Sequence, residues 1–267
     1  MKKLLSLLVC VMAVSPLCAQ RYILRDGKVV NQADVTLKGS NLVQQIAGGS
    51  AEISYPISQV VRLEWPEPKE INQARELLAA GKGAEAEEKI TPIYRQFAPF
   101  PKLPGSWWSE AALVRARALV AAGKSAEAER AARELISTAP DPDDVSAAQL
   151  IIARLQIIQG KADIADAMLD EIMHKDASSY VSARAAVLRG DIAFERKEFE
   201  KALEFYLHVP AFYGDEEEVL PAALLGSARS YRGYGDTARA ERAYLDVTVA
   251  YPNSSEAAVA KREMAKL

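Results

Sequence analysis

One pattern recurs five times along this chain and constrains its fold more than any other feature. The clearest copy covers residues 116–140, where small and apolar residues recur at three- and four-residue spacing on both sides of Gly123. That spacing is the period of a helix buried on one face. Because glycine suits the left-handed conformation that ends a helix, this copy is predicted to form two short helices packed back to back around Gly123.

The other copies are in register with this one. Their turn positions are Gly81, Gly123, Gly160, Lys197 and Gly235, which gives spacings of 42, 37, 37 and 38 residues. A small residue stands seven places before each turn and an alanine five places after it: Ala74, Ala116, Ala153, Gly190 and Ala228, then Ala86, Ala128, Ala165, Ala202 and Ala240. Mostly larger apolar or aromatic residues stand nine and twelve places after it: Ile90, Ala132, Leu169, Tyr206 and Tyr244, then Ile93, Leu135, Ile172, Val209 and Val247. These columns are the predicted core of five stacked helical hairpins.

The small, aromatic and proline positions resemble the signature of the tetratricopeptide repeat from about Pro68 to the C-terminus. The family's early Trp is absent, and the period exceeds its usual length of about 34 residues. The resemblance implies a mainly α fold, a tetratricopeptide-like α-solenoid of about five repeats with a capping helix at residues 256–266. The last repeat, ending in residues 243–267, resembles the C-terminal end of bacterial periplasmic Tol-Pal-associated (YbgF-like) proteins, which implies a cell-envelope context.

The N-terminal residues 1–19 are predicted to be a cleaved signal peptide, with two lysines before an apolar run too short to anchor in a bilayer. We therefore expect a periplasmic or secreted protein. An outer-membrane lipoprotein anchored through Cys18 is the alternative, but Leu17 stands where a lipobox has Gly, Ala or Ser. Both cysteines lie in this segment, so the mature chain is expected to contain no disulfide.

Residues 20–65 differ in kind from the repeats and are predicted to form a small antiparallel β module. Asp26-Gly27 between two apolar runs is a strong hairpin signal, and further turns separate alternating segments. The pattern predicts four to six short strands in a small β-barrel-like module of the SH3 or Sm kind. Trp65 marks the boundary with the helical repeat domain, residues 66–267, and is predicted to be an interdomain packing residue rather than a ligand contact.

The first two turn positions, Gly81 and Gly123, are 42 residues apart, which is the longest spacing. The additional residues lie in a proline-rich loop at residues 97–108. Its aromatic side chains include Phe100, Trp107 and Trp108. The loop is expected to fold back over the first two repeats or the β module, because large exposed apolar patches are rare on monomers. The alternative is an exposed aromatic docking loop, in which Trp107 and Trp108 could stack on sugars.

The sequence contains no recognisable catalytic constellation. His174 and His208 have no partner at ligand spacing, so no metal site and no cofactor are predicted, and the chain is not expected to be an enzyme. The acidic runs at residues 141–144 and 215–218 are predicted to cap helices. The formal charge is 33 − 36 = −3, or 31 − 36 = −5 without Lys2 and Lys3, which gives no reason to expect nucleic acid as a partner.

A charged column lies six places before the turns. It consists of Arg75, Arg117, Arg154, Asp191 and Arg229, and the four arginines are named here the arginine column. In tetratricopeptide repeats this position faces the concave groove, so the resemblance implies a partner-binding stripe. Asp191 is predicted to pair with Arg154 or Arg229. The competing interpretation is that each arginine pairs with an acid of an adjacent repeat while its stem covers apolar surface.

The leading hypothesis is an exported, non-enzymatic scaffold or adaptor that binds a protein or peptide partner in its groove. Because guanidinium groups bind carboxylates in a bidentate manner, the partner is expected to present carboxylates. A membrane- or wall-associated partner would suit a function in cell-envelope assembly or maintenance. The alternative function is binding of envelope polysaccharide, namely peptidoglycan. The sequence leaves the oligomeric state open.

Overall fold

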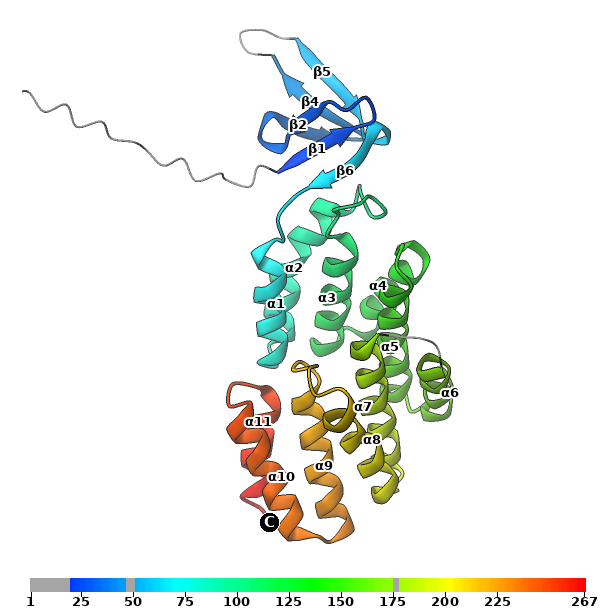
Figure 1. Cartoon of the computed structure of the whole chain (residues 1–267), viewed down its shortest axis with the longest axis vertical. Helices are drawn as coiled ribbons and strands as arrows, with labels where there is room; N and C mark the ends of the chain where they lie inside the picture. The colour runs from blue at the N-terminus through cyan, green and yellow to red at the C-terminus, as the bar shows by residue number, and fades with distance from the viewer. Residues whose placement is uncertain (1–19, 47–50, 175–177) are drawn as a thin grey trace, which may run out of the picture. The chain divides into compact units, whose positions relative to one another are not determined.

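The computed structural model describes residues 20–46, 51–174 and 178–267, and it divides them into two compact units (Figure 1). The first unit holds residues 20–66 together with residues 103–106. The second comprises the rest of the described chain from residue 67 onward and is entirely helical apart from its connections. The predicted signal peptide, residues 1–19, lies outside the described residues.

The first unit contains six short strands in two three-stranded antiparallel sheets, of order β2-β1-β6 and β3-β4-β5. The strands are β1 Arg21–Leu24, β2 Val29–Asn31, β3 Val35–Lys38, β4 Asn41–Gln45, β5 Glu52–Pro56 and β6 Val60–Glu64. The predicted hairpin is confirmed between β1 and β2, where Gly27 has a φ of 84°. The prediction of four to six short strands is confirmed by the six strands of the described residues.

The β unit has its own apolar core, which includes Leu24, Leu42 and Leu63. Trp65 is 8% exposed and meets Tyr22 edge to face with the ring centroids 5.6 Å apart, so it packs inside this unit. The proline-rich loop adds to the same unit, because the backbone N–H of Leu63 donates to the Pro104 carbonyl at 2.9 Å. A side chain at Gly105 would collide with the Leu63 carbonyl oxygen, so only glycine fits this contact.

The second unit consists of five helical hairpins and a final helix (Figure 1). Consecutive helices pack against each other throughout. The helices are α1 Lys69–Ala79, α2 Gly83–Phe97, α3 Trp108–Ala121, α4 Ser125–Thr138, α5 Pro142–Ile158, α6 Ala162–His174, α7 Ser179–Glu195, α8 Phe199–Phe212, α9 Leu220–Tyr234, α10 Thr237–Ala250 and α11 Ser255–Met264. The mainly α architecture predicted from the repeat pattern is confirmed, and α11 is the predicted capping helix.

All five predicted turn positions adopt the left-handed conformation. Their φ angles lie between 61° and 92°, and Lys197 is the single residue other than glycine among them. Each turn closes with the same pair of backbone hydrogen bonds; at Gly123, for example, its N–H donates to the Val120 carbonyl and that of Lys124 to the Leu119 carbonyl. This is the Schellman arrangement that ends a helix, so the register of the repeats follows from local chain geometry.

The predicted core columns are all buried. The alanines at helix crossings, such as Ala116 and Ala128, have no exposed surface, and the larger residues behind them are at most 8% exposed. Gly190 shows why the crossing residue must be small, because a Cβ atom there would lie 2.6 Å from the Tyr206 ring. The helices therefore pack at the positions that the sequence columns predict.

Helix starts follow the predictions in part. Asp141 accepts a hydrogen bond from the Asp143 N–H, and Ser254 caps α11, as the sequence indicated. The acidic run at residues 215–218 does not cap a helix, which corrects the prediction. Helix α9 begins only at Leu220 with no side-chain cap, because proline suits the first turn of a helix and Pro221 places that turn downstream of the acids.

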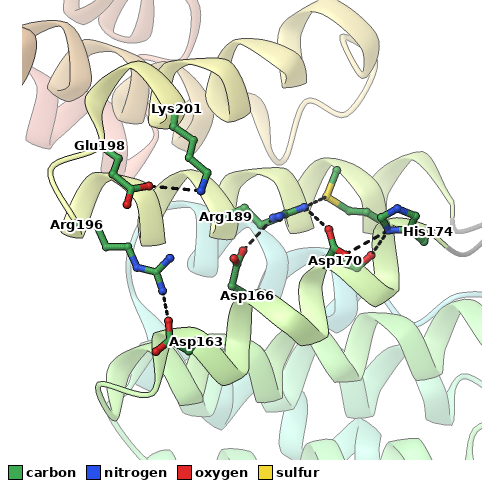
Figure 2. Close-up of polar contacts among 9 residues, drawn as sticks. Asp163, Asp166, Asp170, His174, Arg189, Arg196, Glu198 and Lys201 are labelled. Carbon is green, nitrogen blue, oxygen red and sulfur yellow. Dashed lines mark hydrogen bonds and ion pairs between the residues drawn. The ribbon is translucent and has the colours of Figure 1, made fainter.

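Helices α6 and α7 are joined by a row of ion pairs, named here the α6–α7 seam (Figure 2). Arg189 bridges Asp166 and Asp170 at 3.0 and 2.8 Å, and Arg196 pairs with Asp163 at 2.5 Å.

None of the helices in the described ranges combines the length and apolar character needed to cross a bilayer.

Candidate functional site

The first helices of successive hairpins pack side by side along one face of the helical unit. Contacts link α1 to α3, α3 to α5, α5 to α7 and α7 to α9, and α9 also contacts α11. A cavity of about 680 Å³, named here the groove, lies against this row. Its walls come from α1, α3, α5 and α7 and from the connections before α9 and α11.

The groove is bounded by both ends of the helical unit. Arg75 of the first hairpin and Tyr251 and Glu256 of the last line the same cavity. At the turn of the first hairpin, a Cβ atom on Gly81 would lie 3.1 Å from the Ser255 side chain. The row of helices therefore curves until its two ends approach each other beside the groove.

The arginine column divides between two places. Arg75, Arg117 and Arg154 line the groove, whereas Arg229 is not among its lining residues. The three groove members come from the first helices of three consecutive hairpins, so the predicted stripe is formed there. Apolar side chains such as Leu150 and Leu188 also line the cavity and give the groove a mixed lining.

Each member of the arginine column has a carboxylate partner. Arg75 pairs with Glu110 and, at 3.4 Å, with Glu67. The other pairs are Arg117 with Glu218, Arg154 with Asp191 at 2.7 Å, and Arg229 with Glu263 at 2.6 Å. The predicted pairing of Asp191 with a neighbouring arginine is therefore confirmed. For the first three arginines, pairing with an acid from another part of the chain and lining a groove occur together.

Arg117 is the most enclosed of the column, with 18% of its side chain exposed. Burial lowers the pKa of its guanidinium below the ordinary value, and the nearby guanidinium groups of Arg184 and Arg75 lower it further. The guanidinium also lies 5.9 Å from the Tyr180 ring centroid, within range of a cation–π attraction. Positive charge is thus concentrated around Arg117 in a partly desolvated site.

Arg184, Tyr180 and Glu218 were missed by the sequence analysis. Arg184 and Tyr180 line the groove from α7, and no carboxylate pairs with Arg184 among the residues that the structure describes. A signal existed for Arg184, which stands seven residues before Asp191 and so lies two turns away on the same helix face. No local signal could have linked Glu218 with Arg117, because they are 101 residues apart.

The aromatic side chains of the proline-rich loop are largely core residues. Phe100 is 2% exposed and Trp108 is 1% exposed, and Trp108 packs 6.3 Å from the Tyr94 ring. Trp107 is half-buried. An exposed docking loop is therefore wrong for Phe100 and Trp108, because both side chains complete apolar packing and cannot stack on sugars.

Catalytic chemistry finds no support in the geometry. Within residues 20–46, 51–174 and 178–267, no group of three or more His, Asp or Glu side chains could hold a metal ion. In the α6–α7 seam, the Nδ1–H of His174 donates a hydrogen bond to the Asp170 carbonyl oxygen at 2.8 Å, while the aspartate carboxylates contact arginines (Figure 2). The groove can bind anions through its guanidinium groups.

The helical unit matches two known protein families. The tetratricopeptide repeat-like domain matches residues 73–219, and the tetratricopeptide repeat matches residues 222–254. No curated protein sequence matches the chain significantly. The two matches together extend from the first hairpin to the start of α11.

Proposed function

This chain belongs to the tetratricopeptide repeat-like domain family, and from that premise we propose that it is an exported scaffold or adaptor that binds a protein or peptide in its groove. Tetratricopeptide repeats are protein-interaction modules and typically carry no catalytic activity. The proposal places the partner against the arginine column and assigns the chain no reaction of its own.

The observation that supports the groove as the binding site is the convergence of guanidinium groups on one cavity. Arg75, Arg117 and Arg154 reach it from three helices, and Arg184 joins them from a fourth. A cavity of about 680 Å³ accommodates a short peptide segment but not a folded domain. A partner is therefore expected to insert an extended segment or a chain terminus.

The lining of the groove indicates the chemistry of that segment. Guanidinium groups present several N–H donors in a planar fork, which matches a carboxylate better than any neutral group. Leu113, Leu150 and Leu188 provide apolar surface beside these donors. We expect the bound segment to carry an acidic side chain or a C-terminal carboxylate next to an apolar residue.

The cellular setting is part of the proposal and rests on the sequence. The apolar N-terminal segment supports export to the periplasm or beyond, and the resemblance of the last repeat to Tol-Pal-associated proteins supports an envelope function. The partner would then be a membrane- or wall-associated protein involved in envelope assembly or maintenance.

The proposal is tested by crosslinking mass spectrometry in the native envelope with the double variant Arg117→Ala, Arg154→Ala. Crosslinks from the partner to groove residues are expected in the wild type and at least a tenfold loss of them in the variant. A matched control is Arg196→Ala, which removes an arginine of the α6–α7 seam and should leave the crosslinks unchanged. Partner binding by the wild type should weaken as salt rises, because charge attraction is screened.

Two outcomes would contradict the proposal. One is a folded double variant that forms the same crosslinks as the wild type. The other is sedimentation with purified peptidoglycan that does not depend on Arg117 and Arg154, since this would favour the polysaccharide alternative. Thermal unfolding of each variant separates loss of binding from loss of folding.

A further inference from the structure

The connection between α8 and α9 contains the acidic run Asp215 to Glu218, named here the acidic segment. Because this run caps no helix, its carboxylates can form contacts elsewhere in the helical unit. Glu217 and Glu218 both line the groove, and Val219 next to them is fully buried. The buried valine fixes the end of the segment at the wall of the groove, so Glu218 is held close to the cationic side chains.

Glu218 forms an ion pair with Arg117, and it is the carboxylate that the structure places on this guanidinium. The two side chains differ in exposure, at 36% for Glu218 and 18% for Arg117. A carboxylate with a third of its side chain in water can rotate into solvent at low cost, whereas the guanidinium cannot leave without disturbing its helix. Glu218 is the more exposed member of the pair.

The cationic side of the groove exceeds the negative charge that Glu218 brings to it. Arg117 lies close enough to Arg184 and Arg75 for their charges to lower its pKa, and Arg184 has no carboxylate partner among the described residues. A guanidinium has five N–H donors, and one carboxylate uses at most two of them in a fork. Arg117 and Arg184 therefore retain donors for a further carboxylate oxygen.

We infer that Arg117 and Arg184 form a carboxylate subsite that Glu218 occupies as an internal ligand, and that a partner's carboxylate binds there by displacing Glu218. The inference rests on the proposed function and specifies how its ligand enters the site. Exchange of one carboxylate for another leaves Arg117 paired both in the free chain and in the complex, so the partly buried cation is compensated at both ends of the exchange.

The local backbone makes such an exchange feasible. Hydrogen bonds within the connection are short-range: Glu216 donates to the Tyr213 carbonyl, and Val219 and Leu220 donate to the Glu216 carbonyl. None of these bonds involves the Glu218 side chain, so rotation of its carboxylate breaks the contact with Arg117 alone. Internal occupancy then lowers the apparent affinity for any partner by the fraction of time that the subsite is filled.

The experiment uses the full mature chain and a fluorescein-labelled synthetic peptide with the sequence of residues 213–220, in which the internal carboxylate is presented from outside. Fluorescence anisotropy should show at least tenfold tighter binding to Glu218→Gln than to the wild type. Glu217→Gln is the matched control, because it removes the same charge from the same segment without touching the Arg117 pair. Its affinity should stay within about twofold of the wild type.

Additional variants identify the subsite. Arg184→Ala introduced into the Glu218→Gln background should cancel most of the gain in peptide affinity. A peptide carrying Gln in place of the glutamate that corresponds to Glu218 should likewise bind Glu218→Gln little better than the original peptide binds the wild type. Thermal unfolding of every variant confirms that the helical unit remains folded during the measurement.

Three results would overturn the inference. They are equal affinities for the wild type and Glu218→Gln, an equal gain from Glu217→Gln, and no peptide binding by any variant at millimolar concentration. Failure here is distinct from failure of the proposed function. If Arg117→Ala with Arg154→Ala abolishes partner crosslinks while Glu218→Gln has no effect, the groove binds its partner and the exchange is wrong.

Discussion

Two arginines of the helical unit are equally buried yet have different surroundings. Arg189 in the α6–α7 seam and Arg117 in the groove each have 18% of the side chain exposed. Arg189 contacts two carboxylates that project from a single helix, whereas Arg117 contacts one from a connecting segment and has other cations nearby. Equal burial therefore does not show whether an arginine is structural or available to a partner. The two arginines differ in the number of carboxylates that contact them and in whether those carboxylates project from a helix or from a connecting segment.

The difference has an energetic meaning. Two aspartates on α6 hold the Arg189 guanidinium in place, and its central carbon lies 4.8 Å from the Phe205 ring centroid, so its donors and its cationic face are both used. Arg117 keeps unused donors in a site that has already lost water. A ligand carboxylate gains more at Arg117 because part of the desolvation cost is met on folding.

Arg154 lies between these two cases. Its partner Asp191 also accepts a hydrogen bond from the Tyr206 hydroxyl at 2.8 Å, and the Tyr206 ring packs against Gly190. The carboxylate is thus fixed by helix packing, as in the seam, although Arg154 itself is 44% exposed and lines the groove.

The largest expected effect comes from Gly190→Ala. The added methyl group would lie 2.6 Å from the Tyr206 ring, and overpacking of a tight crossing costs roughly 1–3 kcal/mol of folding free energy. The displaced ring should also carry its hydroxyl away from Asp191. Chemical denaturation of the purified chain measures the loss. Tyr206→Phe, which removes the hydroxyl but keeps the ring, should cost only about 1 kcal/mol.

If Gly190→Ala has the same denaturation midpoint as the wild type, this helix crossing can relax around the added methyl group. The fixed position of Asp191 could then no longer be attributed to helix packing.

A direct comparison of the two buried arginines gives the next largest effect. Arg189→Ala removes two charge-assisted contacts and the packing on Phe205, so a loss of about 1–2 kcal/mol of unfolding free energy is expected. Arg117→Ala removes one contact but also relieves repulsion from Arg184 and Arg75, so it should cost about 0–1 kcal/mol. Denaturant unfolding under identical conditions measures both values.

Equal losses for the two variants, or a larger loss for Arg117→Ala, would break the distinction between the seam and the groove. Circular dichroism at each starting point ensures that the variants are compared as folded proteins.

The sequence predicted those features that depend on short-range periodicity. Gly123 and the equivalent turn residues determine where helices end, and columns such as that of Ala116 determine which face is buried, so both could be identified from spacing. The arginine column could be placed on the inner face of the first helices because the resemblance to tetratricopeptide repeats implied it. Its first three members line the groove, and the fourth does not.

The contacts that were missed depend on how the row of helices curves. Glu218 reaches Arg117 across 101 residues because successive hairpins turn toward each other, and no local pattern encodes that curvature. The acidic segment was predicted to cap a helix because acids before an apolar run usually do. Trp108 was expected to be buried because large exposed apolar patches are rare, but its packing partner Tyr94 on α2 could not be identified from the sequence.

Arg229 is the fourth member of the arginine column, but its surroundings resemble those of Arg189 more than those of the other three arginines. Glu263 on α11 accepts from its Nε and Nη2 at 3.0 and 2.6 Å, and the Tyr244 hydroxyl donates to the same carboxylate at 2.9 Å. This cluster joins α9, α10 and α11, so it attaches the capping helix. Its function should be structural, and it should respond to pH.

The smallest expected effect is therefore a pH-dependent one at Glu263. The hydrogen bond from Arg229 lowers the pKa of Glu263 below its ordinary value of 4.5. A carboxyl group with a lowered folded-state pKa stabilises the fold fully above its unfolded-state value and loses that contribution as pH falls through the folded-state value. Glu263→Gln should lower stability by about 1 kcal/mol at pH 7, or about 2–4 °C in Tm. The gap in Tm from the wild type should narrow below pH 4.5 and close at lower pH. Glu241→Gln, at an exposed position on α10, should show no such gap, and a Glu263 gap that stays constant with pH would contradict the structural function assigned to Arg229.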